Sequence, residues 1–196
     1  MSDSAAAKWD ARYLAGLDSD TPPQPAWVLE ANSHLLPRCG EALDLACGRG
    51  GNALYLAGRG FSVTAWDISA VAIAALTRSS FEREGYVKAE VRDVGRIEWP
   101  RRRFDLIVVS RFLQRELTGS IIAALKPGGL LYYQTFVRAR PGSAGPVSAE
   151  FLLEENELLR MFAPLIVRFY REDARCGDPD AGRRDEAYFV GQRAAE

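Results

Sequence analysis

The chain has 196 residues, 47% of them hydrophobic, and a formal net charge of -1 at pH 7. This length suits one globular domain with a sizeable core, and the near-neutral charge argues against an electrostatic surface for nucleic acid or an anionic membrane. No run approaches the roughly 20 apolar residues of a membrane-spanning helix, and the N-terminus lacks the pattern of a secretory signal, so a cytoplasmic location is expected.

Residues 1–24 are interpreted as an N-terminal arm or lid. The arm carries Trp9 and Tyr13, which are four residues apart and therefore share one face if the arm is helical. Such an arm is able to fold over a ligand. After it, apolar residues at helical spacing predict a helix over residues 27–36 that ends before a proline.

The next part of the chain alternates apolar strands with helices. Ser69 is well placed to cap one of these helices, and the stretch Lys126–Gly129 is expected to stop another before a strand begins. Strands are predicted over residues 42–46, 61–67, 87–93, 104–110 and 130–137, with helices over about 50–57, 69–81 and 117–125.

After a polar loop, a short helix over residues 157–162 and two late strands over 165–170 and 187–190 complete the pattern. Strands separated by helices predict an α/β fold: a doubly wound, Rossmann-like, seven-stranded and mostly parallel sheet with helices on both faces. A ligand would bind beyond the carboxyl ends of the strands. We expect a single domain over 1–196, with a cofactor-binding core in 25–137 and an acceptor-side part in 138–196.

A glycine turn follows the first core strand. Gly48 and Gly50 allow a tight backbone turn and a close approach to a ligand. Asp67 follows about 20 residues later at the end of the next strand, where a carboxylate can accept hydrogen bonds from ribose hydroxyls. The turn also fits the dinucleotide fingerprint through Ala53, so a nicotinamide-dependent oxidoreductase is an alternative, although no Tyr-x-x-x-Lys pair or second substrate domain is seen.

The stretch Leu43–Gly50 resembles motif I of class I S-adenosylmethionine-dependent methyltransferases, and Phe104–Ile107 with Lys126–Leu131 resembles their later motifs. Within that superfamily the chain looks closest to small tellurite-resistance and thiopurine-type methyltransferases. The resemblance implies S-adenosyl-L-methionine as the cofactor and methyl transfer as the activity. A non-catalytic protein that binds this cofactor is the second alternative.

The resemblance also implies roles for particular residues. Asp44 would face the ammonium group of the methionine portion, and Asp67 would accept from both ribose hydroxyls. Asp93 would accept from the adenine amino group, with Ile68 and Val94 packed against the ring. Ala46 stands where the family motif usually has its first glycine. The implied cofactor-binding set is Asp44, Ala46, Gly48, Gly50, Asn52, Asp67, Ile68, Asp93, Val94 and Ser110.

On the acceptor side, Ser110 and Arg111 follow a buried strand at the carboxyl edge and are the candidate catalytic residues. Methyl transfer from a sulfonium is a direct displacement that depends mainly on alignment and the exclusion of water, so no acid–base pair is required. The cysteines lack metal-ligand spacing, and no metal site is expected.

Little of the chain remains for a nucleic-acid or protein-substrate module, so a small-molecule acceptor is expected. Several arginines follow strands on the ligand side of the predicted sheet, and their convergence would favour an anionic or soft, polarisable acceptor. These are Arg111, Arg115, Arg138, Arg140, Arg175, Arg183 and Arg184.

Overall fold

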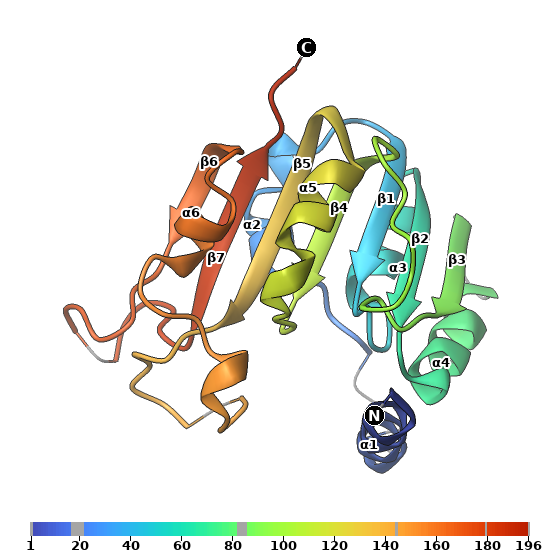
Figure 1. Cartoon of the computed structure of the whole chain (residues 1–196), viewed down its shortest axis with the longest axis horizontal. Helices are drawn as coiled ribbons and strands as arrows, with labels where there is room; N and C mark the ends of the chain where they lie inside the picture. The colour runs from blue at the N-terminus through green and yellow to red at the C-terminus, as the bar shows by residue number, and fades with distance from the viewer. Residues whose placement is uncertain (1, 17–21, 82–85, 144, 179, 196) are drawn as a thin grey trace.

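Seven strands form one mixed sheet in the order β3-β2-β1-β4-β5-β7-β6 (Figure 1). The computed structural model describes residues 2–16, 22–81, 86–143, 145–178 and 180–195. Strands β1 to β5 run parallel, whereas β7 is antiparallel to both of its neighbours. The predicted α/β fold with a mostly parallel sheet is therefore confirmed. The strands are β1 (Gly40–Leu45), β2 (Phe61–Asp67), β3 (Tyr86–Val91), β4 (Phe104–Ser110), β5 (Leu125–Phe136), β6 (Ile166–Arg171) and β7 (Glu186–Gln192).

Helices cover both faces of the sheet. In Figure 1, α5 (Thr118–Ala124) and α6 (Glu157–Met161) lie in front of it, and α2 (Trp27–Ala31) and α3 (Gly51–Ala57) lie behind. Helix α4 (Ala70–Phe81) packs on the same face as α2 and α3. Short 3-10 helices are η1 (Ser33–Leu35), η2 (Arg115–Leu117) and η3 (Ala149–Phe151).

The N-terminal arm contains helix α1 (Ser2–Ala15), which lies beside α4 below the arrowheads of β1 and β2 (Figure 1). The rings of Trp9 and Tyr13 are 6.0 Å apart, which confirms that they share one face of the helix. Residues 17–21 of the predicted arm lie outside the described residues. Helix α1 therefore stands at the edge of the sheet where the parallel strands end.

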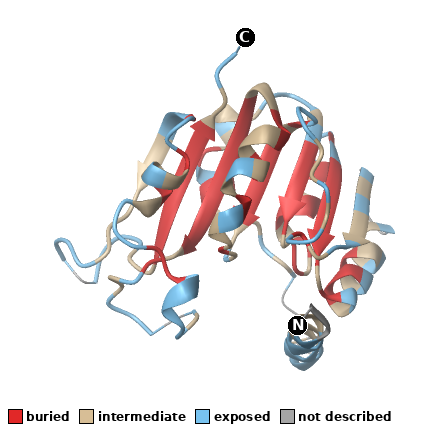
Figure 2. Ribbon diagram, in the orientation of Figure 1, coloured by how far each residue is buried: buried red, intermediate tan, exposed pale blue. Residues whose placement is uncertain are grey.

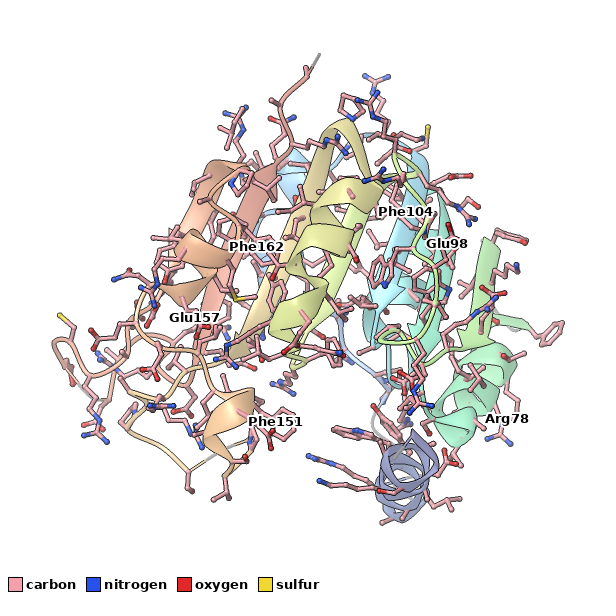
Figure 3. All side chains as sticks on the ribbon, viewed as in Figure 1. Arg78, Glu98, Phe104, Phe151, Glu157 and Phe162 are labelled. Carbon is pink, nitrogen blue, oxygen red and sulfur yellow. The ribbon has the colours of Figure 1, made fainter. Side chains whose placement is uncertain are left out.

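Alternation along the central strands divides the core between the two faces. Leu43 and Leu45 point toward α5 and α6, whereas Ala42 packs with α3. Figure 2 shows the central strands as buried, with more exposed residues on the edge strands β3 and β6. Phe104 and Phe162, labelled in Figure 3, are fully buried on the α5 face.

Trp66 belongs to the core on the α5 face. It is 4% exposed and packs edge-on against Trp99 and Phe104, with ring centroids 5.5 and 6.2 Å away. The indole N–H donates to Glu90 at 3.1 Å. The side chain therefore serves packing on the face opposite to Asp67.

The single helix predicted over residues 27–36 is wrong beyond Ala31. The chain leaves the α-helix at Asn32 and continues as η1. The Asn32 side chain donates to the carbonyl of Val28 at 3.0 Å, and its own carbonyl accepts from the Tyr132 hydroxyl at 2.9 Å. The Leu35 N–H of η1 donates to the same carbonyl, so the chain continues as a tighter 3-10 turn that is also held from β5.

The helix stops before Lys126–Gly129 as predicted, since α5 ends at Ala124. The predicted start of the next strand at residue 130 is wrong, because β5 begins at Leu125 and passes through this stretch. An irregularity in the pairing with β4 accommodates it, and Gly128 adopts a φ of +78°. The Gly128 N–H donates to the Arg193 carbonyl, and the Arg193 N–H donates to the Gly129 carbonyl. Partners from the end of the chain therefore turn a local turn signal into a bulged strand.

The predicted bounds of β2 and β4 agree with the structure, and Ser69 caps α4 by accepting from the Ala72 N–H at 3.1 Å. The two late strands and the short helix before them are also present. Among the described residues, no helix has the length and apolar character needed to cross a bilayer.

Candidate functional site

A row of polar side chains crosses the sheet where the parallel strands end, on the face covered by α2, α3 and α4. Each member lies two residues along its strand from a core residue of that face and therefore points to the same side of the sheet. Because β7 is antiparallel, its first residue rather than its last reaches this edge. We call this set the polar row: Asp67 (β2), Asp44 (β1), Ser110 (β4), Gln134 (β5) and Glu186 (β7).

Asp44 lies between Asp67 and Ser110 in the row and is fully buried. Its oxygens accept from the Asn52 side-chain amide at 3.1 Å and from the Ala53 N–H at 3.0 Å. The same Asn52 amide nitrogen lies 3.3 Å from the Ser110 hydroxyl. The structure thus brings three predicted site residues together and ties them to the first turn of α3. Burial raises the pKa of Asp44 to about 7, although the hydrogen bonds from Asn52 and Ala53 oppose the shift.

The raised pKa of Asp44 predicts a pH-dependent stability. Because this value of about 7 lies above the ordinary 3.8, the folded protein holds a proton here that the unfolded chain releases. The stabilisation is full below about pH 4 and is lost as the pH rises through the folded-state pKa. Relative to the wild type, Asp44→Asn should gain more free energy of unfolding at about pH 8 than at about pH 6, in urea titrations. A difference independent of pH would contradict this assignment.

The turn after β1 adopts a left-handed backbone at alternating positions. Ala46, Gly48 and Gly50 have φ values of +54°, +53° and +83°. A Cβ on Gly50 would lie 2.2 Å from a methyl carbon of Leu76, so the turn packs closely against α4. Ala46 adopts this conformation despite its side chain, at a cost of about 1 kcal/mol relative to glycine. The family motif usually has glycine at this position because glycine adopts positive φ without a steric cost.

Asp67 joins the turn to the end of β2. Its carboxylate accepts from the Gly48 N–H at 2.8 Å and from the Ser69 N–H at 2.9 Å, and the residue is 6% exposed. Burial raises its pKa, although these backbone hydrogen bonds oppose the shift. The carboxylate therefore lies against the glycine turn, as the sequence spacing predicts.

The adenine-side candidates lie on the two loops that follow β2 and β3. Arg92 donates its N–H to the Asp67 carbonyl at 2.7 Å, which brings these loops together. Ile68 is partly exposed, whereas Val94 is buried. Asp93 accepts from the Gly95 N–H at 3.2 Å and pairs with Arg96 at 3.3 Å. Asp93 is therefore partly engaged in its own turn.

Two buried amide side chains hold the segment before α2 over the polar row. The Ala26 N–H donates to Asn52 at 2.8 Å, and the Val28 N–H donates to Gln134 at 3.0 Å. The backbone of Gln24 approaches α3 so closely that a Cβ on Gly51 would lie 2.2 Å from its carbonyl oxygen. This segment and the start of α2 form a strap across the row, from Asn52 to Gln134.

Arg111 follows Ser110 and points along the row to Glu186. Its Nε donates to the Glu186 carboxylate at 2.9 Å, and Gln134 donates to the other oxygen at 2.6 Å. The Glu186 side chain is 8% exposed, whereas that of Arg111 is 66% exposed. A buried carboxylate thus holds an exposed guanidinium at the carboxyl edge by one of its nitrogens.

The structure narrows the expected arginine cluster. In the described part of the chain, Arg111 bonds to a member of the polar row, while most of the others have partners elsewhere. Arg115 pairs with Glu157 at the start of α6 (Figure 3). The remaining contacts are Arg138 with Glu154, Arg140 with the carbonyls of Val137 and Pro146, Arg175 with the Arg140 carbonyl, Arg183 over the Trp27 ring, and Arg184 with four loop carbonyls.

Gln134 and Glu186 belong to the site but are absent from the predicted set. A polar residue within an otherwise apolar strand was the available signal for Gln134. Glu186 gives a weaker signal, because it precedes the predicted late strand and reaches the site only through the antiparallel direction of β7. Among the described residues, no three of the side chains that bind metals lie together as a metal site would require.

Similarity searches point to one family. A family model described as "Tellurite resistance protein TehB" matches residues 20–178. A probable S-adenosyl-L-methionine-dependent methyltransferase TehB from Haemophilus influenzae is 33% identical over 127 residues, which is 60% of this chain and 43% of that protein. The chain thus spans less than half of the length of this relative.

Solved structures agree on the fold. The crystal structure of TehB from Haemophilus influenzae has a TM-score of 0.69 and 22% identity, over 94% of this chain and 67% of that chain. A methyltransferase dependent on S-adenosylmethionine from Methanosarcina mazei has a TM-score of 0.68 and 20% identity, over 88% of this chain and 100% of that chain. At these identities the likeness shows a shared fold.

Proposed function

Because this chain belongs to the tellurite resistance protein TehB family, we propose that it transfers a methyl group from S-adenosyl-L-methionine to a small-molecule acceptor. One observation carries the proposal. The Asp67 carboxylate lies 2.8 Å from the Gly48 N–H, inside a turn whose glycines have positive φ, at the edge where the parallel strands end. This arrangement suits a ligand with a ribose and an amino-acid portion.

The residues at this edge fit such a cofactor. Asp67 would hold the ribose hydroxyls, and Gly48, Gly50 and Ala46 would let the backbone pass beside the amino-acid portion. Ile68, Val94 and Asp93 would surround the adenine. Asp44 is fully buried and accepts from Asn52 and Ala53, so we propose that it favours the ammonium group through its charge rather than by direct contact.

When bound, the cofactor would supply a methyl group attached to a positively charged sulfur. On transfer of this methyl group to the acceptor, the rest of the cofactor would leave as a neutral thioether. The protein then needs to orient the two reactants and exclude water. We propose that Ser110 and Arg111 meet the acceptor; the contacts of Ser110 with Asn52 and of Arg111 with Glu186 support this role. We propose that residues 25–137 hold the cofactor and that residues 138–196, with Glu186, complete the acceptor side.

Binding and transfer together test this function. Calorimetry with S-adenosylmethionine, S-adenosylhomocysteine and NADH should give binding of the two sulfur ligands, and a labelled methyl group should then pass into a metabolite extract. Tight NADH binding alone would favour the oxidoreductase alternative. Binding of the sulfur ligands without transfer to thiol, oxyanion or other metabolite pools would favour a non-catalytic protein. A cytoplasmic location and the absence of a nucleic-acid partner stay predictions from the composition.

We also propose that the acceptor is anionic or soft, with Arg111 as its binding residue. Glu186 accepts from the Nε of Arg111, the guanidinium carbon lies 5.8 Å from the centroid of the Phe136 ring, and the side chain is 66% exposed. Arg111→Ala should raise the KM for the identified acceptor at least about 10-fold and leave the Kd for S-adenosylhomocysteine within about twofold. Methyl-transfer kinetics on the acceptor found in the extract measure the effect.

Arg138→Ala is the matched control, because Arg138 pairs with the exposed Glu154 and not with the polar row. An unchanged acceptor KM in Arg111→Ala, with cofactor still bound, would eliminate the anionic-acceptor proposal. An equal rise in both variants would indicate a general charge effect instead.

A further inference from the structure

Helix α1 is attached to the rest of the protein mainly through polar contacts with the loop after β2. The Ser69 hydroxyl donates to the Asp10 carboxylate at 2.5 Å, and the Val71 N–H donates to the same oxygen at 3.2 Å. The hydrogen bond from Ser69 lowers the pKa of Asp10, so the carboxylate stays ionised. Asp10 therefore adds a negative charge to the N-terminus of α4 from a separate helix.

This attachment leads directly to the proposed cofactor site. Ser69 is two residues beyond Asp67 and donates its N–H to that carboxylate at 2.9 Å. Little apolar surface of α1 supports the contact, since Leu14 is 55% exposed and the helix is largely exposed in Figure 2. The position of α1 thus depends on the geometry of the loop that follows Asp67.

Tyr13, one turn after Asp10, reaches the glycine turn. A Cβ on Gly48 would lie 2.8 Å from the Tyr13 hydroxyl oxygen and 3.5 Å from the ring carbon that carries it. Trp9 packs against the Tyr13 ring on the same face of α1. The Tyr13 hydroxyl therefore lies beside the backbone of Gly48, in the space that glycine leaves because it has no side chain.

The charge around this hydroxyl determines what it can bind. Burial raises the pKa of Tyr13, and the nearby Asp67 and Cys47 raise it further. The phenol therefore stays protonated and acts as a hydrogen-bond donor. The ammonium group of an amino-acid ligand needs acceptors, whereas its carboxylate needs donors such as this phenol.

We propose that Tyr13 is part of the cofactor site and that its hydroxyl donates a hydrogen bond to the carboxylate of the methionine portion. Asp10 is the positioning residue that holds α1 on α4 so that Tyr13 reaches Gly48. This inference rests on the proposed function, since it assigns a further contact to the same ligand. It gives the N-terminal helix a binding role rather than that of a covering segment alone.

A comparison of two ligands tests the contact. Calorimetry would use S-adenosylmethionine and decarboxylated S-adenosylmethionine, which keeps the ammonium group and lacks the carboxylate. Tyr13→Phe should weaken the binding of the first ligand about 10-fold to 100-fold and change the second by no more than about twofold. Tyr86→Phe is the matched control, because Tyr86 lies on the edge strand β3 with 62% exposure, and it should change neither affinity.

Asp10→Ala tests the positioning role. It should lower the affinity for S-adenosylmethionine by about the same factor as Tyr13→Phe, and the double variant should lose no more than either single variant. Hydrogen exchange should show faster exchange of the α1 amides in Asp10→Ala but not in Tyr13→Phe.

Other results would overturn the inference. Equal loss of both ligands in Tyr13→Phe would mean that Tyr13 only supports the fold of the site. Tighter binding of both would mean that Tyr13 competes with the cofactor. If the wild type binds neither ligand, the proposed function itself fails, and this assignment fails with it. The wild-type titration therefore separates the two conclusions.

Discussion

Asp67→Asn is expected to weaken the binding of S-adenosylhomocysteine by at least about 100-fold, because the charged acceptor of two ribose hydroxyls is replaced by an amide with one acceptor oxygen. The Gly48 and Ser69 N–H groups each donate to one oxygen of the present carboxylate. In the variant, the NH2 group of the asparagine would replace one of these oxygens and would meet a backbone N–H, which is also a donor. The glycine turn would lose part of its anchor as well as its ligand contact. Calorimetry on the folded variant measures the change.

Asp105→Asn is the matched control for this result. Asp105 lies at the other end of a parallel strand, where it accepts from the Glu41 N–H and from Lys126, each at 2.8 Å. We expect its ligand affinity to stay within about twofold of the wild type. If both variants lost affinity equally, the loss at Asp67 would reflect general destabilisation, and the ribose assignment would be wrong.

Gly51→Ala is expected to lower the free energy of unfolding by about 2 to 3 kcal/mol. An alanine within a helix is ordinarily the better residue by about 1 kcal/mol, so helix propensity alone predicts the opposite sign. The close contact decides, because the new Cβ would lie 2.2 Å from the Gln24 carbonyl oxygen and 2.7 Å from its carbon. Backbone atoms cannot move aside as a flexible side chain can, so the strap before α2 must shift.

Urea unfolding of Gly51→Ala and Gly119→Ala measures this effect. Gly119 lies in α5, and a Cβ there would meet no atom within 4 Å. The control should therefore be neutral or more stable by about 0.5 to 1 kcal/mol. Equal changes in the two variants would show that the contact between the strap and α3 carries no energetic weight.

Features that depend on local sequence could be predicted well. The buried strands β2 and β4 are bounded by their own apolar runs, and Ser69 caps α4 from the position directly before it. The contact between Asp67 and Gly48 follows from strand length and the parallel direction of β1 and β2. The strand bounds and the helix cap depend on neighbouring residues, and the contact between Asp67 and Gly48 needs only the pairing of two successive strands in addition.

Features that depend on distant partners could not be predicted. The helix after the arm gives way to a 3-10 turn at Asn32, whose carbonyl accepts both from Leu35 in that turn and from the distant Tyr132 hydroxyl on β5. The stretch Lys126–Gly129 is a strand because Arg193 at the end of the chain pairs with it. Asp10 has no local pattern that reports its contact with Ser69, which comes from a separate helix.

The arginines illustrate the same limit within the site. Topology correctly places Arg111 at the carboxyl edge, but it does not report which arginines are already neutralised. Arg115 lies in the same connection and pairs with Glu157, a residue of α6 on the opposite face. Sequence position therefore predicts which loop carries a charge, whereas side-chain partners decide whether that charge is available to a ligand.

The reversed direction of β7 has a consequence for how acceptor preference changes among related chains. Glu186 reaches the site from the start of its strand, so it directly follows a long polar connection. Insertions or substitutions in that connection can redirect the residues that meet the acceptor while the strand keeps its pairing with β5. Asp44 and Asp67 have less freedom, since β1 and β2 lead into α3 and α4. If the proposed sites are right, acceptor choice in this fold is therefore expected to diverge faster than cofactor choice, through the connection between β6 and β7.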